Sequence, residues 1–141
     1  MRELQAASKV VAHYAAKKAN IMTQYVVRIQ GLDFSASALT NPLLELPKDR
    51  EEEVMSSEIP VTYVPARNSI FLAIATAFAE TLGADEVWTG FNAVDYSGYP
   101  DCRPAYVHAM EGALALGTKR GVDGNPVRIV APIITDTTAE I

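Results

Sequence analysis

The spacing of apolar and polar positions predicts a helix followed by a strand at the start of the chain. Leu4, Ala7 and Val11 recur at three- and four-residue intervals, which favours an amphipathic helix over residues 2–18. Lysines in its last turn suit the negative end of the helix dipole. Residues 21–29 are rich in β-branched and aromatic side chains, and we expect them to form a strand.

A long polar segment, residues 31–58, comes next. Gly, Pro, Ser, Asn and Asp residues break any periodicity within it, so we expect a loop. The charge run at residues 49–53 is best interpreted as a solvated part of this loop. Loops of this length inside a domain are often lids, binding loops or disordered segments.

The chain becomes apolar again after this loop. Residues 61–64 are predicted to be short and extended, and residues 66–82 to form a helix that Gly83 is placed to cap in the left-handed conformation. The apolar face of this helix is expected to consist of Ile70, Phe71, Ile74, Phe78 and Leu82.

The remaining pattern predicts a strand, a loop, a helix and a last strand. Residues 86–90 are expected to form a buried strand and residues 91–103 a polar loop. A proline opens the helix at residues 104–117 and a glycine ends it, and residues 127–131 form the last strand. The inner face of that helix is predicted to carry Val107, Met110 and Leu114. Such alternation predicts an α/β fold with a mainly parallel sheet.

Two segments occupy the place where open parallel sheets bind ligands, beyond a strand and before a helix. They are residues 64–68 and residues 90–103. Gly90 and Gly98 let the backbone of the second segment approach a ligand closely. Its amide, carboxylate, hydroxyl and guanidinium groups, which suit polar ligands, belong to Asn92, Asp95, Ser97, Tyr99, Asp101 and Arg103.

The same residue types also dominate turns and helix starts for local reasons. Asp101 could cap the helix that follows it, and Arg67 and Asn68 could stand at a solvent-facing helix start. Composition does not separate these interpretations from a ligand site.

Cys102 stands beside a cation near a helix start, which suggests a thiolate nucleophile with a lowered pKa. A small, partly buried thiol in a turn is the simpler interpretation, and we prefer it. His13 and His108 lie inside helical segments and are interpreted as surface or satisfied histidines. The sequence shows no phosphate-binding motif of the Walker or G-x-G-x-x-G type.

Net charge, cysteine count and hydropathy limit the classes of protein to which this chain can belong. The net charge of −5 argues against a general nucleic-acid binder. The single cysteine excludes an internal disulfide and a cysteine-rich zinc site, and it fits the cytoplasm. We find no secretory leader and no apolar run long enough for a membrane span, so we expect a soluble protein.

Two strings in this chain resemble the 7-cyano-7-deazaguanine synthases of queuosine biosynthesis. Residues 64–71 read V-P-A-R-N-S-I-F, against a family pattern of V-P-G/A-R-N-x-I-F. Residues 90–104 read G-F-N-A-V-D-Y-S-G-Y-P-D-C-R-P, against G-x-N-x-x-D-Y-S-G-Y-P-D-C-R-P. Weaker matches at residues 2–7 and 132–141 extend the resemblance from end to end.

The resemblance implies a Rossmann-like sheet with flanking helices, of the adenine nucleotide alpha hydrolase kind. It implies an ATP-dependent ligase that joins 7-carboxy-7-deazaguanine to ammonia and dehydrates the amide to a nitrile, with ATP and Mg²⁺ as cofactors. It also implies small-molecule partners, no nucleic acid or membrane, and a homodimer or a complementing chain.

Residue by residue, the resemblance implies a site made of the two strings. Arg67, Asp101 and Arg103 would be catalytic, with the arginines holding a carboxylate or phosphate. The base would be bound by polar groups and by a tyrosine ring that stacks on it. The residues that the resemblance implies for this role are Asn68, Asn92, Asp95, Tyr96, Ser97, Gly98 and Tyr99.

Two parts of the family pattern do not occur in residues 1–141: the phosphate loop S-G-G-x-D-S and the cysteines that bind zinc. We therefore expect residues 1–141 to be a single truncated domain, inactive alone and without a metal site. Half of a split enzyme, or a non-catalytic remnant that binds a base or nucleotide, are the alternatives. Without the first strand, the apolar face of the helix at residues 66–82 is expected to be partly uncovered.

Overall fold

The computed structural model describes residues 2–15, 43, 59–137, 139 and 140. The chain divides into two compact units, Met1–Asp33 and Phe34–Ile141, which are described separately. The first contains helix α1, Arg2–Ala15, which confirms the predicted helix up to residue 15. Most of its described side chains are exposed, and Val11 is half-buried. The predicted strand at residues 21–29 lies outside the described residues, as does the loop at residues 31–58 except for Leu43.

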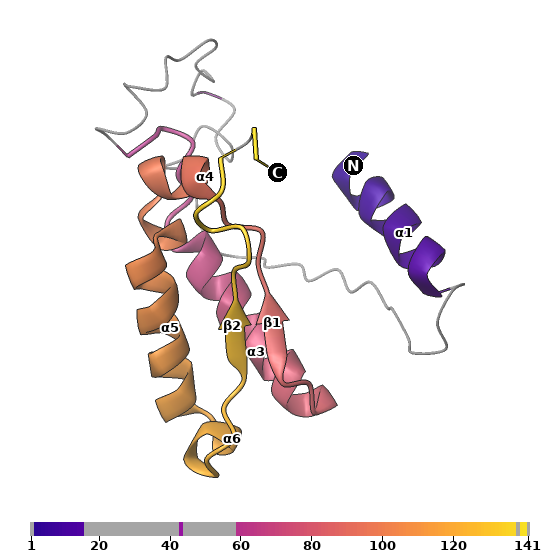
Figure 1. Ribbon diagram of the computed structural model, residues 1–141, viewed down its shortest axis with the longest axis vertical. Helices are drawn as coiled ribbons and strands as arrows, with labels where there is room; N and C mark the ends of the chain where they lie inside the picture. The colour runs from indigo at the N-terminus through magenta and orange to yellow at the C-terminus, as the bar shows by residue number, and fades with distance from the viewer. Residues whose placement is uncertain (1, 16–42, 44–58, 138, 141) are drawn as a thin grey trace. The chain divides into compact units, whose positions relative to one another are not determined.

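The second unit is an α/β arrangement (Figure 1). Strands β1 (Glu86–Trp88) and β2 (Arg128–Val130) pair in parallel, with Val87 opposite Ile129. Its helices are α3 (Arg67–Leu82), α4 (Ala93–Gly98), the 3₁₀ turn η1 (Pro100–Cys102), α5 (Pro104–Gly117) and α6 (Lys119–Val122). The predicted α/β class with a parallel sheet is confirmed.

The core of this unit lies where α3 and α5 meet the strand pair. Helix α3 packs on β1, α5 packs on β2, and the two helices touch each other. Leu72, Val107 and Ile129 form the buried centre, with Met110 and Leu114 packed against it. The inner face predicted for α5 is therefore confirmed, as are its opening proline and closing glycine.

Helix α3 has the predicted length but buries a different face. The side chains of Leu72, Thr76 and Ala79 are buried against the rest of the unit. By contrast, 56% of Phe71 and 66% of Leu82 are exposed. The buried face is therefore not the apolar face that the sequence predicts, and it includes the polar side chain of Thr76. The expectation that the apolar face is partly uncovered is confirmed.

Gly83 ends α3 as predicted, with a φ of 70° in the left-handed region. The N–H of Ala84 donates to the carbonyl oxygen of Ala79 at 2.8 Å, and the N–H of Gly83 donates to that of Glu80 at 3.3 Å. These bonds satisfy carbonyl groups that would otherwise be unpaired at a helix end.

Three local predictions are corrected. Residues 61–64 contain a turn in place of the short extended segment, because the N–H of Tyr63 donates to the carbonyl of Pro60 at 2.8 Å. Residues 91–103 contain α4 and η1 in place of an irregular loop. The strand predicted at residues 86–90 is shorter and is not buried, since 65% of Trp88 is exposed. β Propensity mostly reflects packing against sheet neighbours, so it is weak evidence where few strands pair.

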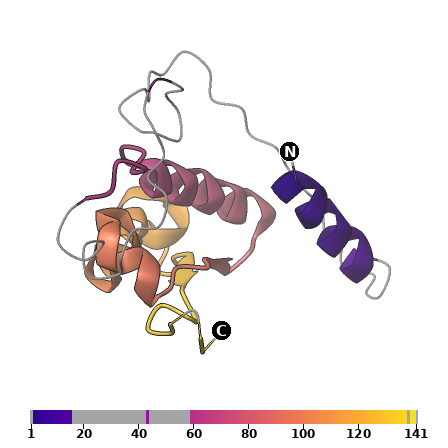
Figure 2. The same cartoon turned by 90° about the horizontal axis from the view of Figure 1, so that it is seen from above.

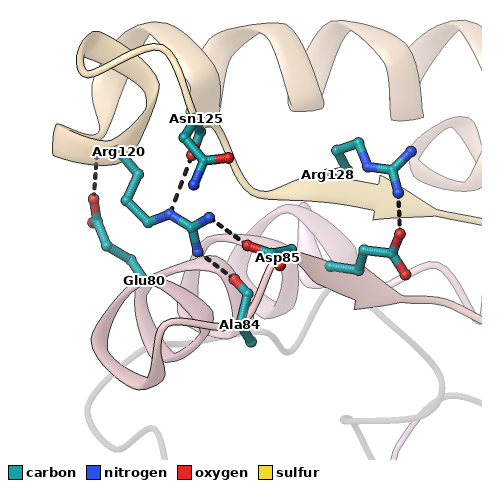
Figure 3. Close-up of polar contacts among 7 residues, drawn as sticks. Glu80, Ala84, Asp85, Arg120, Asn125 and Arg128 are labelled. Carbon is teal, nitrogen blue, oxygen red and sulfur yellow. Dashed lines mark hydrogen bonds and ion pairs between the residues drawn. The ribbon is translucent and has the colours of Figure 1, made fainter.

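Arg120, at the start of α6, ties the ends of three elements together (Figure 3). Its backbone N–H donates to Glu80 Oε1 of α3 at 2.8 Å. Its guanidinium donates to the carbonyl of Ala84 at 2.5 Å, to Asp85 Oδ1 at 2.6 Å and to the carbonyl of Asn125 at 3.1 Å. Only 15% of its side chain is exposed, whereas 76% of that of Asp85 is.

The strand pair itself carries a further ion pair between opposite residues. Glu86 and Arg128 face each other in the register, and their side chains are joined (Figure 3). Glu111 of α5 also accepts a hydrogen bond from the N–H of Ile129 at 2.6 Å. Polar contacts thus join β2 both to β1, through Glu86, and to α5, through Glu111.

Gly121 gives a test of how closely α6 folds back on α5. A Cβ at this position would overlap the backbone of Ala115, so Gly121→Ala should lower the free energy of unfolding by about 1–3 kcal/mol. Urea denaturation of the 141-residue chain measures this difference. Gly112→Ala is the matched control, because nothing lies near its Cβ and alanine favours a helix. Equal stability of the two variants would contradict the close approach.

Ala66 gives a second test, because it precedes α3 with a φ of 53° and is the only non-glycine with positive φ among the described residues. Glycine adopts this conformation without the clash between Cβ and the backbone. Ala66→Gly should therefore raise the free energy of unfolding by about 1 kcal/mol. Gly83→Ala, the reciprocal change at the other end of α3, should lower it by a similar amount. A loss of stability in Ala66→Gly would argue against the left-handed conformation.

Candidate functional site

The two segments that the sequence predicts as ligand-binding lie against each other. Figures 1 and 2 show the segment formed by α4 and η1 beside the start of α3. Asp101 Oδ2 accepts a hydrogen bond from the backbone N–H of Asn68 at 3.1 Å. The side-chain amide of Asn68 in turn donates to Cys102 Sγ at 3.2 Å. We call these three residues, Asn68, Asp101 and Cys102, the buried node.

Asp101 caps a helix, but not the one that follows it. Arg103 is the N-cap residue of α5, and it has no side-chain capping bond. The carboxylate of Asp101 instead serves the first turn of α3, where free N–H groups and the positive end of the helix dipole favour a negative charge. Only 6% of Asp101 is exposed, so its carboxylate is held by the protein.

Cys102 is a buried thiol, as the simpler interpretation of the sequence had it. Only 3% of the residue is exposed. Burial raises its pKa from 9.0 to about 11, and the negative charges of Asp101 and Asp95 add to this. The charge of Arg67 and the hydrogen bond from Asn68 lower the pKa but do not reverse the shift. The hypothesis of an activated thiolate is therefore wrong, because its pKa is raised.

The two arginines of the predicted site differ in exposure. Arg67 is half-buried in the first turn of α3, and its charge is felt at Cys102, so it lies close to the buried node. Arg103 is exposed at the start of α5. Within the described part of the chain, no hydrogen bond or ion pair joins either guanidinium to another side chain. Binding of an anion would therefore cost neither group a contact with a described side chain.

Asn92 serves the turn that it begins. Its side-chain oxygen accepts hydrogen bonds from the N–H groups of Val94 at 2.9 Å and Asp95 at 3.0 Å, which caps α4. Asp95 is half-buried in the first turn of that helix. The turn interpretation that the sequence left open thus holds for the oxygen of Asn92.

The rest of the loop is placed as follows. Gly98 is buried at the end of α4. The hydroxyls of Tyr99 and Thr62 share a hydrogen bond of 2.6 Å, which joins the loop to the turn before α3. Tyr96 and Ser97 lie in α4, and their side chains fall outside the described part of the structure.

Two tyrosines in this region were missed by the sequence reasoning. Tyr106 of α5 donates its hydroxyl to Ser69 Oγ of α3 at 2.8 Å, and burial raises its pKa. The hydroxyl of Tyr63 accepts a hydrogen bond from the N–H of Ala66 at 3.1 Å. Tyr63 directly precedes residues 64–71, and Tyr106 closely follows residues 90–104. This closeness in sequence was the only indication of their place near the site.

Metal ligation finds no support in the described residues. Among them, no three His, Cys, Asp or Glu side chains gather in a way that could hold an ion. In the same part of the chain, no helix has the length and apolar character needed to cross a membrane.

Among the described residues, a parallel pair of strands with helices packed on it, and a polar segment after β1 held against the start of α3, define an α/β protein with a candidate ligand site between these two segments. The whole chain, residues 1–141, matches the family described as queuosine biosynthesis protein QueC. The chain belongs to this family.

Relatives of the chain carry the name 7-cyano-7-deazaguanine synthase. The protein of Nostoc punctiforme is 49% identical over 140 residues, which cover 99% of this chain and 60% of that protein. The protein of Trichodesmium erythraeum is 45% identical over 141 residues, covering 100% of this chain and 61% of its own length. That of an Anaeromyxobacter species is 53% identical over 116 residues, covering 82% and 50%. The chain thus spans between 50% and 61% of the length of these relatives.

The raised pKa of Cys102 predicts a slow thiol. Alkylation of the folded chain by iodoacetamide should be slow at neutral pH and should accelerate as the pH approaches about 11, because only the thiolate reacts. Asp101→Asn should lower this pKa, since it removes a neighbouring negative charge. The chain has one cysteine, so the rate reports this thiol alone.

The control is the same chain in urea, where the thiol should titrate near its ordinary value of 9.0. A titration midpoint below that value in the folded chain would contradict the buried, carboxylate-flanked thiol.

Proposed function

We propose that this protein takes part in the ATP-dependent conversion of 7-carboxy-7-deazaguanine and ammonia to 7-cyano-7-deazaguanine. The family match over residues 1–141 and the names of the relatives support this proposal. The single observation that carries it is the bond between Asp101 and the N–H of Asn68. This bond brings together the two strings that set the family apart, although they are far apart in the sequence.

In this proposal Arg67 holds the anionic group of a ligand. Its guanidinium is suited to a carboxylate or a phosphate, since two N–H groups can bind two oxygens at once. It stands in the first turn of α3, where backbone N–H groups also favour anions. Arg103, exposed before α5, is proposed to hold a second anionic group.

The base is proposed to bind along α4. Asp95, Tyr99 and the amide nitrogen of Asn92 can pair with the donors and acceptors of a deazaguanine edge. Tyr96, Ser97 and Gly98 belong to the same turn and are kept as part of the proposed base site. Gly98 would allow close approach of the backbone.

ATP would supply the chemistry that turns a carboxylate or amide oxygen into a leaving group. We assign its phosphates to Arg67 and Arg103, because guanidinium groups suit phosphate oxygens. They are not assigned to Mg²⁺ or zinc, because no group of three ligands is found among them. The contribution proposed for this chain is to orient the base and to neutralise negative charge near the reacting oxygen.

Arg67→Ala tests this function in the complete gene product. Removing one preorganised cation should lower kcat/KM for nitrile formation by on the order of a hundredfold. The nitrile is measured by mass spectrometry after incubation with 7-carboxy-7-deazaguanine, ATP and ammonia. Arg67→Lys should recover part of the loss, because the charge remains but the paired N–H groups do not.

Arg128→Ala is the matched control. Its guanidinium pairs with Glu86 on the strand pair, and 65% of its side chain is exposed. Its loss should change stability by less than about 1 kcal/mol and leave kcat/KM nearly unchanged. Normal activity of Arg67→Ala would reject the assigned role. Binding of the base without ATP, measured by calorimetry, would favour a non-catalytic binding protein, whereas activity only with a second chain would favour a split enzyme.

A further inference from the structure

The buried node has the geometry of a support for the first turn of α3. Asp101 Oδ2 accepts the N–H of Asn68 at 3.1 Å, and this N–H belongs to the second residue of the helix. The amide of Asn68 reaches Cys102 Sγ at 3.2 Å. All three residues are at most 8% exposed. The contacts join η1 to the start of α3, and the node has little access to solvent.

The turn that the node supports does not adopt its conformation freely. Ala66, immediately before α3, has a φ of 53°, which disfavours any side chain with a Cβ. The N–H of Ala66 donates to the hydroxyl of Tyr63, and the N–H of Arg67 donates to the carbonyl of Val64 at 3.2 Å. Such a conformation persists only where surrounding contacts fix it.

Arg67 lies between these two features in the chain. Ala66 precedes it with the unfavourable φ, and Asn68 follows it with the N–H that Asp101 holds. The direction in which Arg67 leaves the helix therefore depends on both neighbours. Arg67 is half-buried, whereas the carboxylate of Asp101 is buried and already bonded. The group free to meet an anionic ligand is the guanidinium.

We propose that Asp101 and Asn68 are positioning residues: they fix the first turn of α3 so that Arg67 meets the ligand, and Asp101 does not meet it itself. This inference rests on the proposed function above. It changes the role first expected for Asp101, from a group that touches the substrate to a group that acts through Arg67. It also gives Asn68 a partner within the protein.

Two substitutions at Asp101 separate the positioning role from direct contact. Asp101→Asn keeps a side-chain oxygen that accepts the N–H of Asn68 but removes the charge. Asp101→Ala removes both. A positioning role predicts that kcat/KM for nitrile formation falls by about threefold in Asp101→Asn. In Asp101→Ala it should fall on the order of a hundredfold, since the turn is released.

A second-site change tests the same idea from the other side of Arg67. Glycine at position 66 adopts the left-handed conformation without Asp101 to enforce it. Ala66→Gly added to Asp101→Ala should therefore recover about tenfold in kcat/KM. If Asp101 contacts the ligand, Ala66→Gly restores nothing, because the missing carboxylate is not replaced.

Hydrogen exchange at the N–H of Asn68 gives a readout that needs no activity. Exchange should be slow in the wild type and in Asp101→Asn, and fast in Asp101→Ala and in the double variant, which both lack the acceptor for this N–H. Far-ultraviolet circular dichroism of each variant checks that the rest of the fold is intact. If the wild type makes no nitrile, the proposed function fails, and exchange still decides whether Asp101 holds the turn.

Three outcomes would overturn the positioning role. One is unchanged exchange at Asn68 in Asp101→Ala. Another is a loss of kcat/KM in Asp101→Asn as large as in Asp101→Ala while Asn68 stays protected. The third is a double variant whose kcat/KM does not recover although its circular dichroism matches that of the wild type.

Discussion

The hydrogen bond from the backbone N–H of Asn68 to the carboxylate of Asp101 is the contact on which the candidate site depends. It joins the start of α3 to the loop after β1, two segments separated by 33 positions in the chain. A charged acceptor makes this bond stronger than a neutral one, and burial protects it from water. The bonds from Asn68 to Cys102 and between Thr62 and Tyr99 join the same two regions, but only this one ends on a charged acceptor.

The other end of α3 is held by a different kind of contact. Arg120 reaches Glu80, Ala84 and Asp85 with both its backbone and its guanidinium. These bonds cross from α6 to the end of α3 and the start of β1. The helix is therefore fixed at both ends by polar groups. The buried face between these ends carries Leu72, Thr76 and Ala79.

Local signals in the sequence account for the long helices. Gly83 and the proline and glycine of α5 mark helix ends for reasons of backbone conformation, and those ends are where the structure has them. The role of Asp101 was not predictable, because its partner lies in a distant segment and a cap is normally sought in the next helix. The buried face of α3 was missed because the prediction relied on apolar character, which favours burial of Phe71 over burial of Thr76. In the structure Thr76 is buried and Phe71 is exposed.

The charges around the buried node explain how a single arginine stays available at a site that contains two carboxylates. Burial, together with the charges of Asp101 and Asp95, raises the pKa of Cys102 to about 11, so the thiol adds no third negative charge at neutral pH. The carboxylate of Asp101 is stabilised by the N–H of Asn68 and the positive end of the helix dipole, and it forms no ion pair with another described residue. Arg67 thus forms no ion pair with Asp101 or with any other residue of the buried node. Because the N–H of Asn68 already binds the carboxylate of Asp101, we propose that the guanidinium of Arg67 can bind a ligand.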